Sequence, residues 1–114
     1  MDRDQSRTYG VLVICSGGFE GMEYELRSEE TLIGRNPTTD VTLLDQKISR
    51  VHSVILYDRE DDSYTIEDLQ STNGTKVNGK KVRSSELSDD DEIEIGHTRF
   101  RFLIRRHEEP AVSG

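Results

Sequence analysis

A chain of 114 residues with a net charge of −8 is long enough for one domain with a modest core and too short for two. With 32% apolar and 33% charged residues, it is typical of a soluble globular protein, and its acidity argues against general nucleic-acid binding, which depends on a basic surface. No apolar run approaches the ~20 residues of a membrane span, and the first seven residues lack the apolar core of a signal peptide, so we expect a cytoplasmic protein without membrane contact.

The N-terminal part of the chain predicts three strands. Residues 9–15 are aliphatic and β-branched, and they end at a Ser-Gly-Gly turn. Residues 22–27 alternate apolar and charged side chains, which is typical of a strand with one face in the core, and residues 31–33 begin a third strand. Cys15 lies in the first apolar run, so we expect a buried and inert thiol. As the single cysteine, it excludes an internal disulfide framework and a multi-cysteine metal site.

The middle of the chain alternates short strands with loops rich in turn-forming residues. Strands are expected at residues 41–43, 52–57 and 64–68. The segment 34–40 contains Gly, Asn, Pro and Asp and is expected to be a loop. The very acidic segment 58–63 is expected to close a hairpin between the second and third of these strands.

The C-terminal part contains two Asn-Gly dipeptides, at positions 73–74 and 78–79, which tolerate positive φ. The short stretches after them, 76–77 and 81–82, are therefore expected to be edge strands of a tight ribbon. Two more strands are predicted at residues 91–95 and 98–104, and Phe100, Phe102 and Ile104 share one face of the last.

This pattern predicts an all-β antiparallel sandwich with no major helix. The domain is expected to span residues 9–105. Residues 1–8 are expected to form a flexible segment, and residues 106–114 a polar tail or a linker within a longer protein.

Polar side chains that suit an anion follow or precede three of the predicted strands. Arg35 follows one strand, Ser49 and Arg50 precede another, and Thr72 and Asn73 follow a third. If these loops meet at one end of the sandwich, they offer two guanidiniums, two hydroxyls and a carboxamide. Such a set suits a dianionic phosphate, whose oxygens match a planar arginine fork, better than a bare carboxylate.

Neighbouring residues are expected to shape these loops. Gly34 and Gly74 would allow close backbone approach, and Asn78 tolerates a turn conformation. His52 is expected to lock its loop with a ring hydrogen bond rather than to touch a ligand, and Val51 is expected to pack inward.

A catalytic role is not expected. Ser49 and His52 could suggest a hydrolase, but no orienting acid and no nucleophile-elbow glycine pattern accompany them. The three histidines lack metal-ligand spacing, and the acidic run 89–91 lacks a calcium-loop pattern, so no metal or cofactor is expected.

The combined pattern resembles the signature of the forkhead-associated (FHA) domain. It consists of Gly34-Arg35, Ser49-Arg50-x-His52, Thr72-Asn73-Gly74-Thr75 with Asn78-Gly79, and Asp91-x-Ile93-x-Ile95-Gly96. The resemblance covers residues 9–104, and it implies a sandwich of about eleven strands, FHA/SMAD-like, that recognises phosphothreonine in extended peptides.

The resemblance also implies a role for each matching residue. Arg35 and Ser49 would be the principal phosphate ligands, with further contacts from Arg50 and Thr72. Asn73 would bind the peptide backbone just beyond the phosphothreonine. Loop-shaping roles fall to Gly34, His52, Gly74 and Asn78. Lys47 lies where the family often reads the third residue after the phosphothreonine, and a lysine there favours an acidic side chain.

We therefore expect a phosphopeptide-binding module for signalling or regulated assembly. Its partner would be a phosphothreonine-containing protein, either a Ser/Thr kinase or a kinase substrate, and the domain would belong to a larger protein or a regulatory complex. The alternative is a phosphate-independent interaction or oligomerisation domain that uses its sheet faces or acidic loops.

Overall fold

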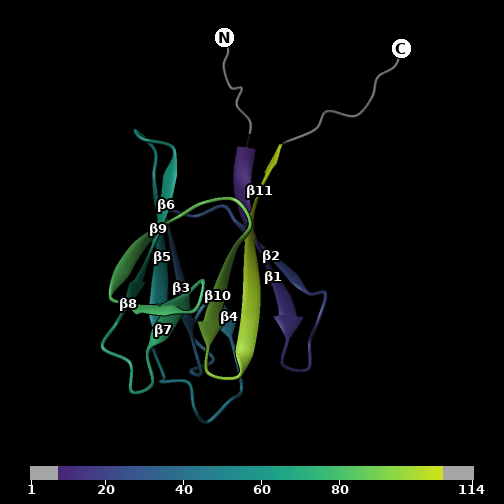
Figure 1. The fold of residues 1–114 in the computed structure, drawn as a ribbon, viewed down its shortest axis with the longest axis vertical. Helices are drawn as coiled ribbons and strands as arrows, with labels where there is room; N and C mark the ends of the chain where they lie inside the picture. Colours follow the sequence, from purple (N-terminus) through teal and green to yellow (C-terminus); the bar gives the residue numbers. More distant parts are fainter. Residues whose placement is uncertain (1–7, 107–114) are drawn as a thin grey trace.

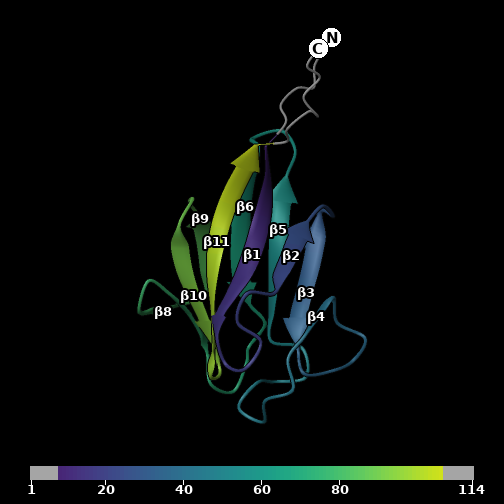
Figure 2. The same cartoon turned by 90° about the vertical axis from the view of Figure 1, so that its right-hand side faces the viewer.

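The computed structural model describes residues 8–106, which form eleven β-strands in two sheets packed on each other (Figures 1 and 2). The six-stranded sheet has the order β2 (Glu23–Leu26), β1 (Thr8–Ser16), β11 (Thr98–Arg106), β10 (Asp91–Ile95), β7 (Thr75–Val77), β8 (Lys80–Val82). The five-stranded sheet has the order β4 (Val41–Thr42), β3 (Glu30–Gly34), β5 (Ser53–Asp58), β6 (Ser63–Asp68), β9 (Ser84–Leu87). The expected all-β sandwich without a major helix is thus confirmed over the described residues.

Pairing is antiparallel throughout this region, except for a two-residue parallel contact between β3 and β4. The long central pair β1–β11 runs from Thr8 opposite Arg106 to Ser16 opposite Arg99. Both strands extend one residue past the expected domain 9–105. The rest of the expected end segments, residues 1–7 and 107–114, lies outside the residues that the structure describes. Within residues 8–106, no helix is long and apolar enough to cross a membrane.

The core is filled by alternate side chains of both sheets, as period-2 strands require. Phe100 and Phe102 of the first sheet and Ile33, Ile55 and Ile66 of the second are almost completely inaccessible. With no tryptophan in the chain, aliphatic side chains and these two phenylalanines supply most of the buried volume.

The strand that the sequence analysis missed is β9 (Ser84–Leu87). It contains a single large apolar residue, Leu87, which is buried opposite Tyr64 of β6. One apolar residue gives no alternation to detect, and the strand is defined by its pairing with β6 rather than by its own composition.

The expectation that Cys15 is buried was wrong, and Ile104 lies on the predicted face but is only partly buried. Cys15 is exposed because Ile14 takes the core-facing position and the register against β11 shifts between Ile14 and Ser16. Ile104 shares a face with Phe100 and Phe102 but is 37% exposed, because β10 pairs with β11 only as far as Phe102.

Tyr64 connects the two sheets through the core. Its buried hydroxyl accepts a hydrogen bond of 2.8 Å from the backbone N–H of Gly10 on β1, and its ring meets Phe102 edge-on with centroids 5.3 Å apart. A Cβ at position 10 would lie 2.9 Å from Phe102 and 3.0 Å from Tyr64, so glycine is needed for this close approach. Burial raises the pKa of Tyr64, so the hydroxyl stays protonated at neutral pH.

We predict that Tyr64→Phe lowers the free energy of unfolding by about 1–3 kcal/mol, because it leaves the Gly10 N–H unpaired in the interior. Urea denaturation followed by circular dichroism would measure the change. Tyr57→Phe is the matched control, because the Tyr57 hydroxyl donates to Asp62 on the surface and its loss should cost less than ~0.5 kcal/mol. Equal losses for the two variants would contradict the role assigned to the Tyr64 hydroxyl.

Candidate functional site

The loops that follow β3, precede β5 and follow β6 lie together at one end of the sandwich, at the bottom of Figures 1 and 2. Two backbone hydrogen bonds join the first two loops: Arg35 N–H donates to the carbonyl of Ser49, and Asn36 N–H donates to the carbonyl of Arg50, both at 3.1 Å. A Cβ on Gly34 would overlap the Arg50 carbonyl oxygen. Glycine at position 34 therefore allows the two strand ends to lie side by side.

The side chain of Arg35 is held by one nitrogen and open at the others. Its Nε donates to the carbonyl of Ile48 at 3.0 Å, which fixes the direction of the guanidinium. Among residues 8–106, no partner lies at its two terminal nitrogens, at the guanidinium of Arg50 or at the hydroxyl of Thr72. These groups are therefore available donors on the rim of the loops.

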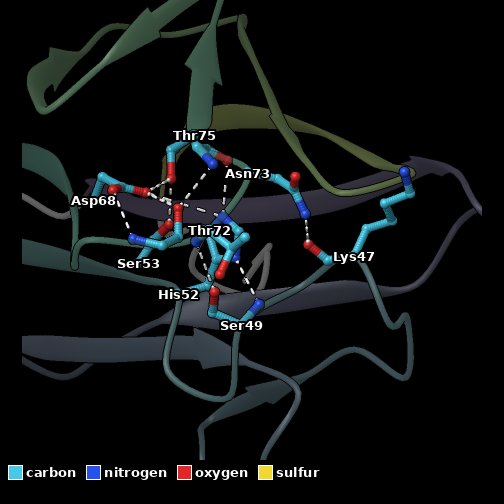
Figure 3. Close-up of polar contacts among 10 residues, drawn as sticks. Lys47, Ser49, His52, Ser53, Asp68, Thr72, Asn73 and Thr75 are labelled. Carbon is cyan, nitrogen blue, oxygen red and sulfur yellow. Dashed lines mark hydrogen bonds and ion pairs between the residues drawn. The ribbon is translucent and has the colours of Figure 1, made fainter.

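The third loop is tied to the second by two contacts that involve predicted site residues (Figure 3). Thr72 N–H donates to Ser49 Oγ at 3.0 Å, and Asn73 Nδ2 donates to the carbonyl of Lys47 at 2.8 Å. The Ser49 hydroxyl proton and Asn73 Oδ1 have no acceptor or donor within the described part of the chain. The same two side chains thus position the loops and keep free capacity for a ligand.

His52 links the second and third loops from the buried side of the site. Its ring is completely buried; Nδ1 accepts the Ser49 N–H at 3.1 Å, and Nε2 lies 2.8 Å from the carbonyl of Gly74. Because one partner can only donate and the other can only accept, the ring is the neutral tautomer with its proton on Nε2. Val51, expected to pack inward, is instead 40% exposed, since the next side chain, His52, fills the interior.

The same geometry excludes Ser49 and His52 as a nucleophile and its base. The imidazole faces the backbone N–H of Ser49 and not its hydroxyl, and the other ring nitrogen is occupied by Gly74. Among residues 8–106, no three His, Cys, Asp or Glu side chains lie close enough together to hold a metal ion.

Asp68, at the end of β6, organises the loop that contains Thr72 and Asn73. Its Oδ1 accepts hydrogen bonds from the hydroxyls of Ser71 (2.5 Å) and Thr75 (2.7 Å), and its Oδ2 accepts the Ser71 N–H at 3.0 Å. Ser71 Oγ in turn accepts the N–H of Gly74 at 2.9 Å. The loop is therefore folded around one carboxylate.

The network continues into the core and fixes the charge of this carboxylate. Because Thr75 gives its proton to Asp68, the contact of 2.8 Å between Ser53 Oγ and Thr75 Oγ1 must have Ser53 as donor. Burial opposes the charge on Asp68, but the hydrogen bonds from Ser71 and Thr75 outweigh it, and the pKa of Asp68 lies below its usual value. The carboxylate is ionised at neutral pH.

A second carboxylate, Asp45, braces the β4–β5 loop against the β10–β11 turn. Asp45 Oδ2 accepts the His97 N–H at 2.8 Å, and Oδ1 accepts the Lys47 N–H at 2.9 Å. Burial opposes the charge here too, and the two backbone hydrogen bonds overcome it and lower the pKa of Asp45. The base of Lys47 is thereby fixed, while its ammonium is exposed.

No role is predicted from the sequence for four residues that hold these loops: Asp68, Ser71, Ser53 and Asp45. A signal exists for the first pair: an aspartate at the start of a turn-rich run often caps the backbone N–H groups that follow it, here that of Ser71. No local signal exists for Ser53, whose partner Thr75 lies 22 positions away.

Comparison with known proteins identifies the chain's relatives. Residues 31–96 match the FHA domain family. The oxoglutarate dehydrogenase inhibitor of Corynebacterium jeikeium is 41% identical over 93 residues, which cover 82% of this chain and 63% of that protein. The glycogen accumulation regulator GarA of Mycobacterium tuberculosis is 36% identical over 93 residues, which cover 82% of this chain and 56% of that protein. The chain thus spans less than two thirds of these curated relatives.

Solved structures are also similar to this chain. An FHA domain from an analysis of phosphothreonine-dependent FHA domain interactions has a TM-score of 0.75 and 34% identity, and the match covers 89% of this chain and 99% of that one. EmbR of Mycobacterium tuberculosis, solved with a low-affinity phosphopeptide, has a TM-score of 0.77 and 31% identity, and the match covers 89% of this chain and 26% of that one.

We predict that Asp68→Asn lowers the free energy of unfolding by about 1.5–3 kcal/mol at neutral pH, because the acceptor loses its charge and one of its two acceptor oxygens is replaced by an NH2 group. The folded-state pKa of Asp68 is depressed, so its contribution is complete above the unfolded pKa of about 3.9 and is lost as the pH falls through the lower folded value. The difference in the free energy of unfolding between wild type and Asp68→Asn should therefore disappear in acid.

Urea denaturation at neutral pH and at a series of pH values below about 4 would test this. Glu67→Gln is the control: within residues 8–106, the neighbouring Glu67 carboxylate has no hydrogen bond or ion pair, so its loss should change little at any pH. If Asp68→Asn lowers the free energy of unfolding by the same amount at every pH, the negative charge assigned to Asp68 is contradicted.

Proposed function

The chain belongs to the FHA domain family, and we propose that it is a non-catalytic module that binds phosphothreonine in an extended peptide. The observation that carries the proposal is a set of donors on the rim of three loops that have no partner within residues 8–106, while hydrogen bonds on the inner side hold the loops together. The similarity to FHA domains studied for phosphothreonine-dependent interactions supports the same ligand chemistry.

We assign the phosphate first to Arg35 and Ser49. The two terminal nitrogens of Arg35 form the planar fork that matches two phosphate oxygens, and Nε is already fixed by Ile48. The Ser49 hydroxyl still has a proton to donate. Arg50 and Thr72 would add further donors, and each charge-assisted hydrogen bond could contribute about 1.5–3 kcal/mol.

The peptide chain would pass Asn73 and then Lys47. Asn73 Oδ1 is free to accept a backbone N–H just beyond the phosphothreonine, since Nδ2 is occupied by the Lys47 carbonyl. The exposed ammonium of Lys47 would favour an acidic side chain at the third position after the phosphothreonine. The loops themselves are shaped by Gly34, His52 and Gly74. Asn78, at a φ of 52°, instead lies in the β7–β8 turn and binds Asp91 and Glu92 of β10.

A preference for threonine over serine would require a niche for the γ-methyl group. Burial of one methyl contributes only about 0.8 kcal/mol, so strong discrimination also needs the methyl to fix the phosphate geometry. The loop 71–75, folded around Asp68, is rigid enough to provide such a surface.

We further propose that the partner is a phosphothreonine-containing protein, a Ser/Thr kinase or a kinase substrate, bound in the cytoplasm during signalling or regulated assembly. The names of two relatives, an oxoglutarate dehydrogenase inhibitor and a glycogen accumulation regulator, support a regulatory role. With a net charge of −8, the protein as a whole repels an anionic peptide, and the arginines and Lys47 of the rim would attract its phosphate locally.

We predict that Arg35→Ala lowers affinity for a phosphothreonine peptide by at least about 100-fold, because two charge-assisted hydrogen bonds are removed. Isothermal titration calorimetry would measure it, with the unphosphorylated peptide as a second ligand that should not bind. Arg35→Lys should also bind weakly, because an ammonium does not reproduce the fork.

Arg59→Ala is the matched control, since Arg59 is an exposed arginine in the β5–β6 hairpin at the opposite end of the sandwich. Its affinity should equal that of the wild type. Unchanged affinity for Arg35→Ala would show that the site is misplaced, and equal binding of both peptides would favour a phosphate-independent interaction domain.

A separate prediction concerns the ligand's charge. The second pKa of a phosphothreonine is about 6, so affinity should decrease as the pH falls below that value. Titrations between neutral pH and about pH 5 would measure the decrease. Affinity that stays flat over this interval would count against a site selective for the dianion.

A further inference from the structure

A groove of about 480 Å³ opens beside the candidate site, between the β1–β2 loop, the β4–β5 loop and the β10–β11 turn. Its volume is within the ~300–1,000 Å³ of typical ligand pockets. Phe19, Leu43, Leu44, Lys47 and His97 are among the residues that line it, and we call it the Phe19–Leu44 groove.

Two large apolar side chains in this groove are open to water. Phe19 is 59% exposed and Leu44 is 82% exposed, although Leu43, the residue before Leu44, is buried. Single exposed apolar residues are ordinary on a protein surface. Two that come from different loops and line one groove form a patch, which is typical of an interaction site.

The groove is continuous with the path proposed for the peptide. Lys47 and His97 line both the groove and a smaller pocket of about 190 Å³, whose other lining residues include Asn73 and Gly74. A peptide that leaves Asn73 and passes Lys47 therefore reaches the mouth of the groove.

The floor of the groove is also held in place before any ligand binds. Asp45 accepts the backbone N–H groups of both Lys47 and His97, so the two loops that flank the groove share one carboxylate. A surface fixed in this way loses little conformational entropy on binding.

We propose that the Phe19–Leu44 groove receives a large apolar side chain of the phosphorylated partner, at a position beyond the third residue after the phosphothreonine. This inference rests on the proposed function, because the phosphate site and Asn73 set the direction of the peptide. A second copy of the chain fits less well, since two molecules with a net charge of −8 repel each other.

The test begins with an oriented peptide library that has one fixed phosphothreonine and random residues up to about nine positions after it. Extended residues span about 3.3 Å each, so this length reaches well past Lys47. The wild-type protein should select Leu, Met, Ile or Phe at one position beyond the third. That peptide and a truncated form that ends at the third residue are then compared by calorimetry.

Leu44→Ser and Phe19→Ser should each lower affinity for the long peptide by about tenfold and leave affinity for the truncated peptide unchanged. Met22→Ser is the matched control: Met22 is also apolar, 45% exposed and in the β1–β2 connection, but does not line the groove. It should bind both peptides as the wild type does.

Three results would overturn the inference while the proposed function stands. In the first, the library selects no apolar residue beyond the third position. In the second, both groove variants bind the long peptide as tightly as the wild type does. In the third, the variants lose as much affinity for the truncated peptide as for the long one. Sedimentation velocity that detects a dimer dependent on Leu44 would assign the groove to a second copy instead. If no phosphothreonine peptide binds the wild type, the proposed function fails and the groove inference fails with it.

Discussion

The buried imidazole of His52 is the contact on which the rest of the site depends. Its two nitrogens bind a donor from the β4–β5 loop, Ser49 N–H, and an acceptor from the β6–β7 loop, the Gly74 carbonyl. Because a completely buried polar ring must satisfy both nitrogens, neither loop can move without leaving one unpaired. The ring therefore sets the distance between Ser49 and the loop that contains Thr72 and Asn73.

The carboxylates that hold the loops are fully hydrogen-bonded, whereas the side chains on the rim keep donors without a partner among the described residues. Asp68 uses both of its oxygens on Ser71 and Thr75, and Asp45 does the same on two backbone N–H groups. On the rim, the terminal nitrogens of Arg35 and the guanidinium of Arg50 have no partner among residues 8–106. A donor such as Arg35, which is fixed at Nε and unpaired at its terminal nitrogens, can bind an anion without first breaking protein contacts and is preorganised in this sense.

The sequence predicts most strands because alternation is a local signal. The expected site residues come from a resemblance to a family motif, and the structure brings their three loops to one end of the sandwich. Prediction from the sequence fails where side-chain direction depends on distant partners. A register shift against β11 turns Cys15 outward, and the placement of His52 leaves Val51 exposed. β9 is defined by its pairing with β6. The link from Ser53 to Thr75 joins residues 22 positions apart, so no pattern of neighbours could predict it.

The candidate site also lies where the two sheets meet, so its residues come from both sheets. Its three loops adjoin β3, β5 and β6 of the five-stranded sheet. Thr75, however, begins β7 of the six-stranded sheet, and the Gly96–His97 turn connects β10 and β11 of that sheet. Gly96 has a φ of +59°, and a Cβ there would lie 2.5 Å from Ile48 and 2.8 Å from Asp45. Ile48 is buried in the core directly before Ser49. A change that shifts the β10–β11 turn against Ile48 would therefore also shift Ser49, so the position of Ser49 depends on how the two sheets pack.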